Sequence, residues 1–288
     1  MTSAYSFVEG WIVEAPGSPA EYWIVKGYEH PPGKVVAAPY RRGGKRLDPR
    51  SIEQAPLWTI EHFPCRGGPV PMLSLDAASS KPVNPWRVLE LRYPDLPHPI
   101  KHLLEEVNPE LAGLTGSWAV FAEDRGSDVD LIVYGDPDEI YLALKYLKSR
   151  GAIVRHKHKR SEYPLDSARL LDSCIKNGGE TACYTLRILR YTTPRECSKR
   201  LTPLGLYAGP LEITGEQEAL DSILVPARYR AVLLKLGLPA VVETWRTSYQ
   251  ELKPGVYAGV LEVFADQNGA ITASPDLKGH LKPMASAW

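Results

Sequence analysis

Two neighbouring motifs near the middle of the chain constrain its fold most, residues 115–117 (Thr-Gly-Ser) and residues 127–133 (Ser-Asp-Val-Asp-Leu-Ile-Val). The apolar residues of the second motif predict a buried strand. Because side chains alternate between the two faces of a strand, Asp128 and Asp130 leave the same face. The sequence therefore predicts a central strand that presents two adjacent carboxylates.

Two carboxylates side by side suit Mg²⁺, which takes one or two protein carboxylates together with phosphate oxygens and water. Gly116 and Ser117 stand where a short helix is expected to begin, over residues 118–122, so their amides and the helix dipole can hold a phosphate group. The alternative is structural: Asp128 caps a turn, Asp130 forms an ordinary ion pair, and Gly116-Ser117 merely starts a helix. The residues alone leave both interpretations open.

Gly-Ser followed 12 residues later (128 − 116 = 12) by Asp-x-Asp-Leu resembles the active-site signature of the DNA polymerase beta-type nucleotidyltransferase superfamily, particularly its small prokaryotic and archaeal members. The resemblance implies that Gly116 and Ser117 bind a nucleoside triphosphate and that Asp128 and Asp130 hold one or two Mg²⁺. The metals would position the α-phosphate for attack by an acceptor hydroxyl and stabilise the leaving pyrophosphate. The expected activity is transfer of a nucleoside monophosphate to a hydroxyl acceptor, with RNA favoured as the acceptor.

The chain departs from the superfamily pattern in two ways. The Ala-Arg-Gly run that usually follows Gly-Ser in the small members is replaced by Ala119-Val120-Phe121. A third carboxylate on a later strand is also missing, because the best candidate strand, residues 186–190, carries Arg187 and Arg190. Glu212 or Asp172 can stand in as the third acid. Without one, a catalytically inactive nucleotide- or RNA-binding protein of the same fold becomes the alternative.

Two basic segments are candidates for contacts with a polyanion. The first follows a predicted strand and has glycines that allow close approach, and it carries Arg41, Arg42, Lys45 and Arg46. The second, residues 155–160, carries Lys157, Lys159 and Arg160, and its flanking cations oppose a metal site at its two histidines. Arg187, on the strand expected over residues 183–191, is a further candidate for a polyanion contact. The alternatives without a binding role are a solvated hairpin tip for the first segment and an exposed edge strand for the second.

Hydrophobic periodicity predicts an α+β protein with a nucleotidyltransferase-like α/β core, residues 86–198, inserted between β-rich segments, residues 1–75 and 200–288. The N-terminal segment is expected to hold strands over 10–14, 22–26 and 34–38, the last ending at Pro39. The core is expected to hold helices over 100–111, 139–148 and 167–176, and strands over 129–134, 153–160 and 183–191. The linker between the first two segments is expected near residues 76–86.

The C-terminal segment contains an internal repeat. Residues 207–213 (Tyr-Ala-Gly-Pro-Leu-Glu-Ile) recur 50 positions later (257 − 207 = 50) as residues 257–263 (Tyr-Ala-Gly-Val-Leu-Glu-Val). A related pattern also links residues 222–230 with residues 34–41. These similarities predict one barrel-like domain built from both β-rich segments; unrelated hairpins are the alternative.

Composition limits the partners and the compartment. Lys and Arg number 34 and Asp and Glu number 34, so no global field draws the protein to nucleic acid or lipid, and a polyanion needs a local patch. The first residues lack the features of a leader and no long apolar run occurs, so we expect a cytoplasmic protein with no membrane partner. The four cysteines form no C-x-x-C pair and are expected to be buried thiols. Few Asn and Gln favour a thermophilic source, in which a disulfide such as Cys174 with Cys183 is the alternative.

Overall fold

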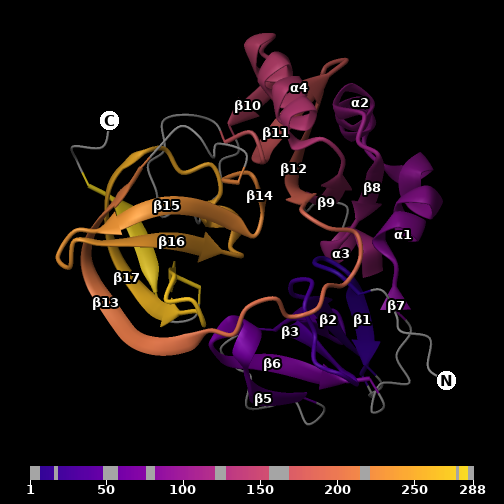
Figure 1. The fold of residues 1–288 in the computed structure, drawn as a ribbon. Coiled ribbons are helices and arrows are strands. Elements are labelled where there is room, and N and C mark those ends of the chain that lie inside the picture. The colour runs from indigo at the N-terminus through magenta and orange to yellow at the C-terminus, as the bar shows by residue number, and fades with distance from the viewer. Residues whose placement is uncertain are drawn as a thin grey trace.

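The computed structural model describes residues 7–15, 19–47, 58–75, 82–120, 128–155, 169–214, 221–276 and 279–284. These residues form three sheets, with strands more abundant than helices, which confirms a mixed α+β protein. In Figure 1 the N-terminal sheet, the helix-bearing central sheet and the C-terminal barrel lie around a common centre.

The N-terminal sheet has the strand order β5-β6-β3-β2-β1-β7, and β4 pairs with β3. Its strands are β1 (Ile12–Ala15), β2 (Glu21–Val25), β3 (Lys34–Arg42), β4 (Lys45–Arg46), β5 (Trp58–Phe63), β6 (Gly68–Ser74) and β7 (Pro82–Val83). The expected end at Pro39 is wrong, because β3 continues to Arg42. A register shift between Tyr22 and Trp23 places Pro39 beside a bulge, where a residue without an N–H donor is tolerated.

The central sheet has the order β10-β11-β12-β9-β8, and β14 pairs with β12. Its strands are β8 (Leu111–Leu114), β9 (Val129–Tyr134), β10 (Ile153–Arg155), β11 (Asp172–Asn177), β12 (Glu180–Leu189) and β14 (Leu224–Val225). The helices are α1 (Pro85–Arg92), α2 (His98–Val107), α3 (Gly116–Val120) and α4 (Pro137–Ser149), with short 3₁₀ turns η2 (Pro64–Arg66), η3 (Tyr93–Asp95) and η4 (Thr247–Tyr249). The predicted strand over 129–134 is confirmed.

Local capping explains two helix boundaries. α4 begins where the Asp136 carboxylate accepts hydrogen bonds from the amides of Asp138 and Glu139, at 2.8 and 3.3 Å, which satisfies free donors of the first turn. α2 ends before Asn108, whose left-handed backbone (φ 45°) stops the helix. The predicted helix over 100–111 was therefore too long at its C-terminal end, since Leu111 already belongs to β8.

The helix predicted over 167–176 is wrong. Residues 172–177 form β11, which pairs along its whole length with β12. Cys174 lies opposite Cys183 in this ladder, and the two form a disulfide with a Cα–Cα distance of 3.8 Å. Pairing with a neighbouring strand thus overrides the local helical pattern.

One face of the central sheet is packed against helices α2 and α4. Its core includes Leu103, Leu144, Leu131 and Leu186, each at most 1% exposed. The opposite face carries Ile132 and Leu189, which pack with buried residues of the N-terminal sheet. The carboxylate-bearing face of β9 is consequently turned toward the N-terminal sheet.

The C-terminal barrel closes in the order β13-β15-β16-β18-β17, with β17 returning to β13 and β19 added outside β17. Its strands are β13 (Thr202–Ile213), β15 (Ala227–Leu233), β16 (Leu238–Thr244), β17 (Gly255–Ala265), β18 (Ile271–Ser274) and β19 (His280–Pro283). The expectation that N-terminal strands share this barrel is not met, because they pair only within their own sheet over the described residues. The two copies of the repeat pair antiparallel with each other about Gly209 and Gly259.

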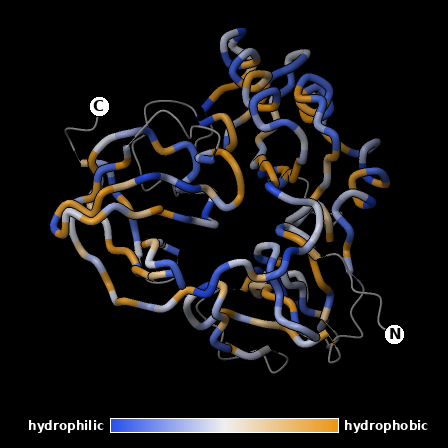
Figure 2. Tube along the Cα trace, viewed as in Figure 1, coloured by the Kyte–Doolittle hydropathy of each residue, from blue (hydrophilic) through white to orange (hydrophobic). Residues whose placement is uncertain are grey.

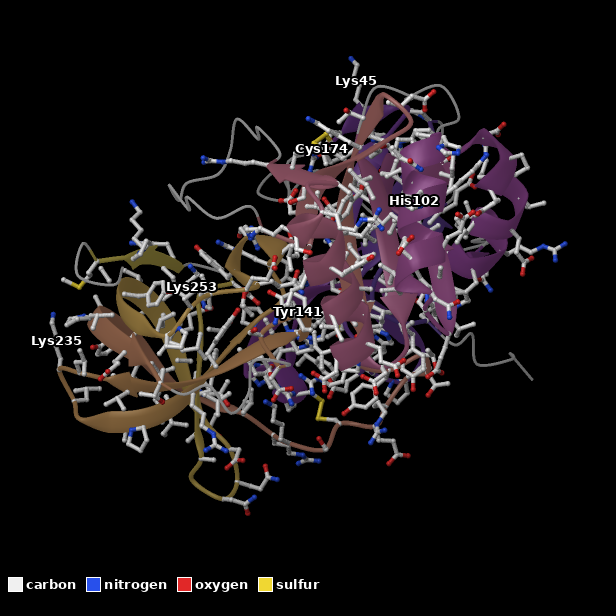
Figure 3. The ribbon with its side chains drawn as sticks, turned by 90° about the horizontal axis from the view of Figure 1, so that it is seen from above. Lys45, His102, Tyr141, Cys174, Lys235 and Lys253 are labelled. Atoms are coloured by element: carbon white, nitrogen blue, oxygen red, sulfur yellow. A yellow bond between two sulfur atoms is a disulfide. The ribbon has the colours of Figure 1, made fainter. Side chains whose placement is uncertain are left out.

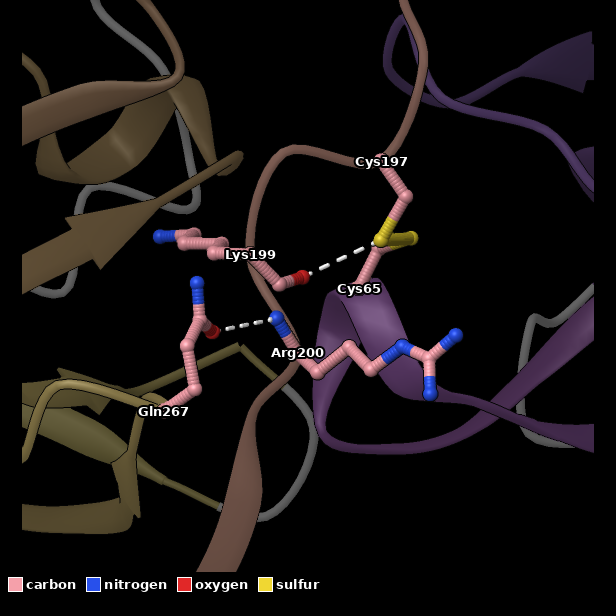
Figure 4. The surroundings of a disulfide bond; sticks show 5 residues. All are labelled: Cys65, Cys197, Lys199, Arg200 and Gln267. Atoms are coloured by element: carbon pink, nitrogen blue, oxygen red, sulfur yellow. Dashed lines mark hydrogen bonds between the residues drawn. A yellow bond between two sulfur atoms is a disulfide. The ribbon is translucent and has the colours of Figure 1, made fainter.

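Covalent and polar contacts join the three sheets. A disulfide connects Cys65 of η2 with Cys197, in the segment that leads into the barrel (Figure 4). Beside it, the Arg200 amide donates to Gln267 Oε1 at 3.0 Å. Glu251, which precedes β17, accepts hydrogen bonds from the amides of Leu170 and Leu171. The barrel is therefore fixed to both other sheets.

Among the described helices, none has the length and apolar character needed to cross a membrane. Figure 2 shows short hydrophobic stretches alternating with hydrophilic ones along the described trace.

Candidate functional site

The structure brings the two sequence motifs into contact. The Thr115 amide donates to the Asp130 carbonyl at 2.9 Å, which extends the β8–β9 ladder to the start of α3. Gly116 follows with φ 65°, and a β-carbon on it would overlap the carboxylate of Asp130 and lie 2.7 Å from its Cγ. Only glycine fits here, both for its backbone conformation and for this close approach.

The Gly-Ser loop itself is largely enclosed. Ser117 is 4% exposed, and Thr115 donates its hydroxyl to the carbonyl of Gly10 at 2.5 Å. The helix that follows, α3, has five described residues, so its dipole is much weaker than that of a full helix. An anion at this site would depend on charged side chains more than on the helix.

Strand pairing decides which residue stands beside the two carboxylates. β12 runs parallel to β9, with Thr185 opposite Asp130 and Arg187 opposite Ile132. Partners in such a register point to the same face, so Arg187 shares a face with Asp130. The charge of Arg187 also acts on Asp130. The strand that would bear a third carboxylate therefore bears an arginine.

Arg187 is held by a carboxylate that the sequence did not single out. Glu9 has no exposed surface, and its Oε1 accepts from Arg187 Nη1 at 2.5 Å and from Lys26 Nζ at 3.3 Å. Its Oε2 accepts from the Gly27 amide at 2.8 Å. Burial raises the pKa of Glu9, but the two cations and the amide outweigh it, so the pKa lies below the ordinary value.

At Asp130 burial outweighs the neighbouring cations, so the pKa lies above its ordinary value. Burial raises the pKa of Asp130 to about 6; the charge of Arg187 opposes this shift, and the neighbouring Asp128 adds to it. Arg46 and Lys26 lower the pKa by smaller amounts. A divalent cation held between Asp128 and Asp130 would stabilise the ionised form further, so this donor pair fits Mg²⁺ chemically.

The first basic segment contributes positive charge near the site. Arg46 acts on Asp130 from β4, whereas Arg42 is paired with Glu21 and Arg41 Nη1 donates to the Gly44 carbonyl at 2.8 Å. Lys45 is exposed, and Figure 3 shows its side chain extending away from the molecule. The polyanion contacts expected at Lys157, Lys159 and Arg160 lie outside the described residues.

Neither substitute for the third acid joins the pair. Glu212 is exposed on β13 of the barrel, opposite Val232 and Val256. Asp172 lies opposite Thr185, and therefore one strand further from β9 than Arg187 does. Within the described ranges no group of three His, Cys, Asp or Glu side chains is arranged to hold a metal ion.

Sequence reasoning missed Glu9 and Lys26. Glu9 follows Phe7 and Val8, and an acidic residue beside such apolar neighbours is a signal of a buried charge that requires a partner. The identity of that partner had no local signal, because Arg187 lies 178 residues away in the sequence.

Comparison of the chain with protein-family models, with curated proteins and with solved structures gives no match.

Proposed function

We propose that this chain binds a nucleoside triphosphate together with Mg²⁺ on the face of β9 and does not transfer the nucleotidyl group. The observation that carries the proposal is the position of Arg187, on the strand beside Asp130 and on the same face. A guanidinium remains charged at any physiological pH, so it neither binds a second metal ion nor accepts a proton from a hydroxyl. Binding by two carboxylates survives this substitution, while two-metal transfer chemistry does not.

In this proposal each group has a separate task. Asp128 and Asp130 hold Mg²⁺, and Gly116 leaves room for the carboxylate of Asp130 beside the Gly-Ser loop. Mg²⁺ retains waters and takes its remaining ligands from phosphate oxygens. Arg46, exposed on β4 and close enough to act on Asp130, supplies positive charge for the phosphates.

Nucleotidyl transfer is the second candidate. It is supported by the contact between Gly116 and Asp130, which assembles both halves of the signature. RNA is the acceptor that this candidate favours, since exposed cations at Lys45 and Arg46 can contact a phosphate backbone. Five-stranded closed barrels also serve oligonucleotide recognition in other proteins, but a fold alone assigns no ligand.

Ligand-dependent melting tests the proposal. ATP, GTP, CTP and UTP are added separately, with and without Mg²⁺, and the Tm is recorded by differential scanning fluorimetry. A ligand at about 100 times its Kd stabilises by about 2.7 kcal/mol, which for a chain of this size is roughly 5 °C. We expect a Mg²⁺-dependent increase for at least one triphosphate.

Two variants and one assay complete the test. Asp128→Asn/Asp130→Asn should abolish the Mg²⁺-dependent increase, whereas Asp138→Asn, at an exposed position in the first turn of α4, should leave it unchanged. Incubation with α-labelled triphosphates, Mg²⁺ and RNA should release no pyrophosphate. If the label is transferred by the wild type and not by the double variant, the transferase candidate replaces the proposal. If no triphosphate raises the Tm, both the binding proposal and the transferase candidate are rejected.

A further inference from the structure

Glu9 occupies a position that has the donors of an anion-binding site. Two cationic side chains and one backbone amide converge on its carboxylate, at 2.5 Å from Arg187, 3.3 Å from Lys26 and 2.8 Å from the Gly27 amide. These donors come from β12 and from the end of β2, so the carboxylate joins two sheets. Charged donors and a backbone amide aimed at one point are the groups that hold phosphate oxygens in proteins.

The segment that carries Glu9 lies directly beside the proposed nucleotide site. The carbonyl of Gly10 accepts the Thr115 hydroxyl at 2.5 Å, one residue before Gly116. A β-carbon on Gly10 would lie 2.9 Å from Cγ2 of Ile132, two residues beyond Asp130 on β9. Residues 9 and 10 therefore cover the same face of β9 that carries Asp130.

Electrostatics makes Glu9 and a bound phosphate competitors. Lys26 and Arg187 are the two cations that Glu9 neutralises, and both also act on Asp130. The side chains of Lys26 and Arg187 are 30% and 19% exposed, whereas that of Glu9 is fully buried. Leaving two such cations without an anion is unfavourable, because neither is fully hydrated. One carboxylate and one phosphate group cannot both take the full set of donors.

We propose that Lys26, Arg187 and the Gly27 amide form an anion site for phosphate groups, which Glu9 fills as an internal ligand until the triphosphate of a nucleotide displaces it. That the displacing anion is a nucleotide rests on the proposed function. The anion site itself is independent of Mg²⁺ and of the base. It therefore has a probe of its own, inorganic tripolyphosphate.

Glu9→Gln tests the site, because it removes the internal negative charge and keeps the size of the side chain. In metal-free buffer of constant ionic strength, Glu9→Gln should melt below the wild type in sodium chloride and recover with tripolyphosphate. We expect an affinity of Glu9→Gln for tripolyphosphate at least ten times that of the wild type. Glu61→Gln is the matched control, since it breaks a half-buried pair with Lys34 and should gain no affinity.

Further variants make the outcome specific. Glu9→Gln/Arg187→Met should not show the increased affinity for tripolyphosphate, because one of the two cations is absent. If Glu9→Gln does not fold, Glu9→Asp keeps the charge, withdraws it from the donors, and should give a smaller gain. Equal affinity in the wild type and both Glu9 variants, or a gain that persists without Arg187, would overturn the site. Wild-type protein that fails to bind Mg²⁺-triphosphate while Glu9→Gln gains tripolyphosphate binding would reject only the proposed function.

Discussion

Gly116 lies against the carboxylate of Asp130, in a left-handed conformation (φ 65°) that leaves no space for a β-carbon. We expect Gly116→Ala to lower the free energy of unfolding by about 3 kcal/mol, because backbone strain and displacement of Asp130 add together. The change should also abolish Mg²⁺-dependent triphosphate binding. Urea unfolding and the melting assay measure the two effects.

Gly33→Ala separates backbone strain from the contact. Gly33 has a similar φ of 70°, but a β-carbon there would meet nothing within 4 Å. Its cost should be about 1 kcal/mol, from the left-handed conformation alone. Equal losses of stability for the two variants would show that the Asp130 contact contributes nothing.

Glu251 should be a major contributor to the attachment of the barrel. Its Oε1 accepts from the Leu170 amide at 2.9 Å and from the Tyr141 hydroxyl at 3.2 Å, and its Oε2 accepts from the Leu171 amide at 3.1 Å. In Figure 3, Tyr141 lies between the helical region and the barrel. Glu251→Ala leaves these donors unpaired, and we expect a loss of about 2–4 kcal/mol in urea unfolding.

The control for Glu251 must account for its backbone, which has φ 59°. Glu251→Gly removes the same carboxylate without left-handed strain, so it should lose slightly less stability than Glu251→Ala. Glu180→Ala, at the exposed first residue of β12, should cost less than about 0.5 kcal/mol. A Glu251→Gly variant as stable as the wild type would show that the Glu251 carboxylate does not stabilise the attachment of the barrel.

His30 should make stability depend on pH. The Val36 amide donates to Nδ1 at 3.2 Å, so the proton resides on Nε2, which donates to the Phe7 carbonyl at 3.2 Å. Burial lowers the pKa of His30 from 6.5 to about 4. Because the folded pKa is the lower one, the contribution is complete above pH 6.5 and is lost as the pH falls toward 4.

Guanidinium unfolding at several pH values measures this effect. The wild type should lose up to about 3 kcal/mol through His30 between pH 6.5 and 4. His30→Gln should be less stable at pH 7 and should show a correspondingly smaller loss over this interval. His98→Gln, at an exposed histidine that contacts Asn177, controls for the removal of a histidine. Parallel pH profiles for wild type and His30→Gln would refute the assignment.

The two disulfides should differ in their effect. Cys65–Cys197 spans 132 residues and Cys174–Cys183 spans 9. Restricting the unfolded chain then predicts losses of about 5 kcal/mol for Cys65→Ala/Cys197→Ser and about 3 kcal/mol for Cys174→Ala/Cys183→Ser. Urea unfolding without reductant, after thiol counting by mass spectrometry, gives the ranking. A larger loss from the short-range pair would contradict the loop-length argument.

Local sequence was sufficient to predict the secondary structure around the two carboxylates. The apolar pattern of residues 129–134 predicted β9, and the pattern of residues 139–148 predicted α4 apart from its ends, because periodicity involves residues a few positions apart. It was insufficient for β11, where pairing with β12 replaced the expected helix. It was also insufficient for the barrel, because the repeat at residues 207–213 and 257–263 does not reveal with which strands each copy pairs.

The placement of Asp128 and Asp130 on one face is thus a prediction from the sequence alone, since a strand alternates its side chains wherever it lies. What faces that pair was decided only by the tertiary structure. Packing of the N-terminal sheet against β9 brings Glu9 to Arg187 across 178 residues, and parallel pairing sets Arg187 on the same face as Asp130. Such contacts are selected by burial of whole sheets and by the need of each buried charge for a partner, and neither leaves a local pattern in the chain.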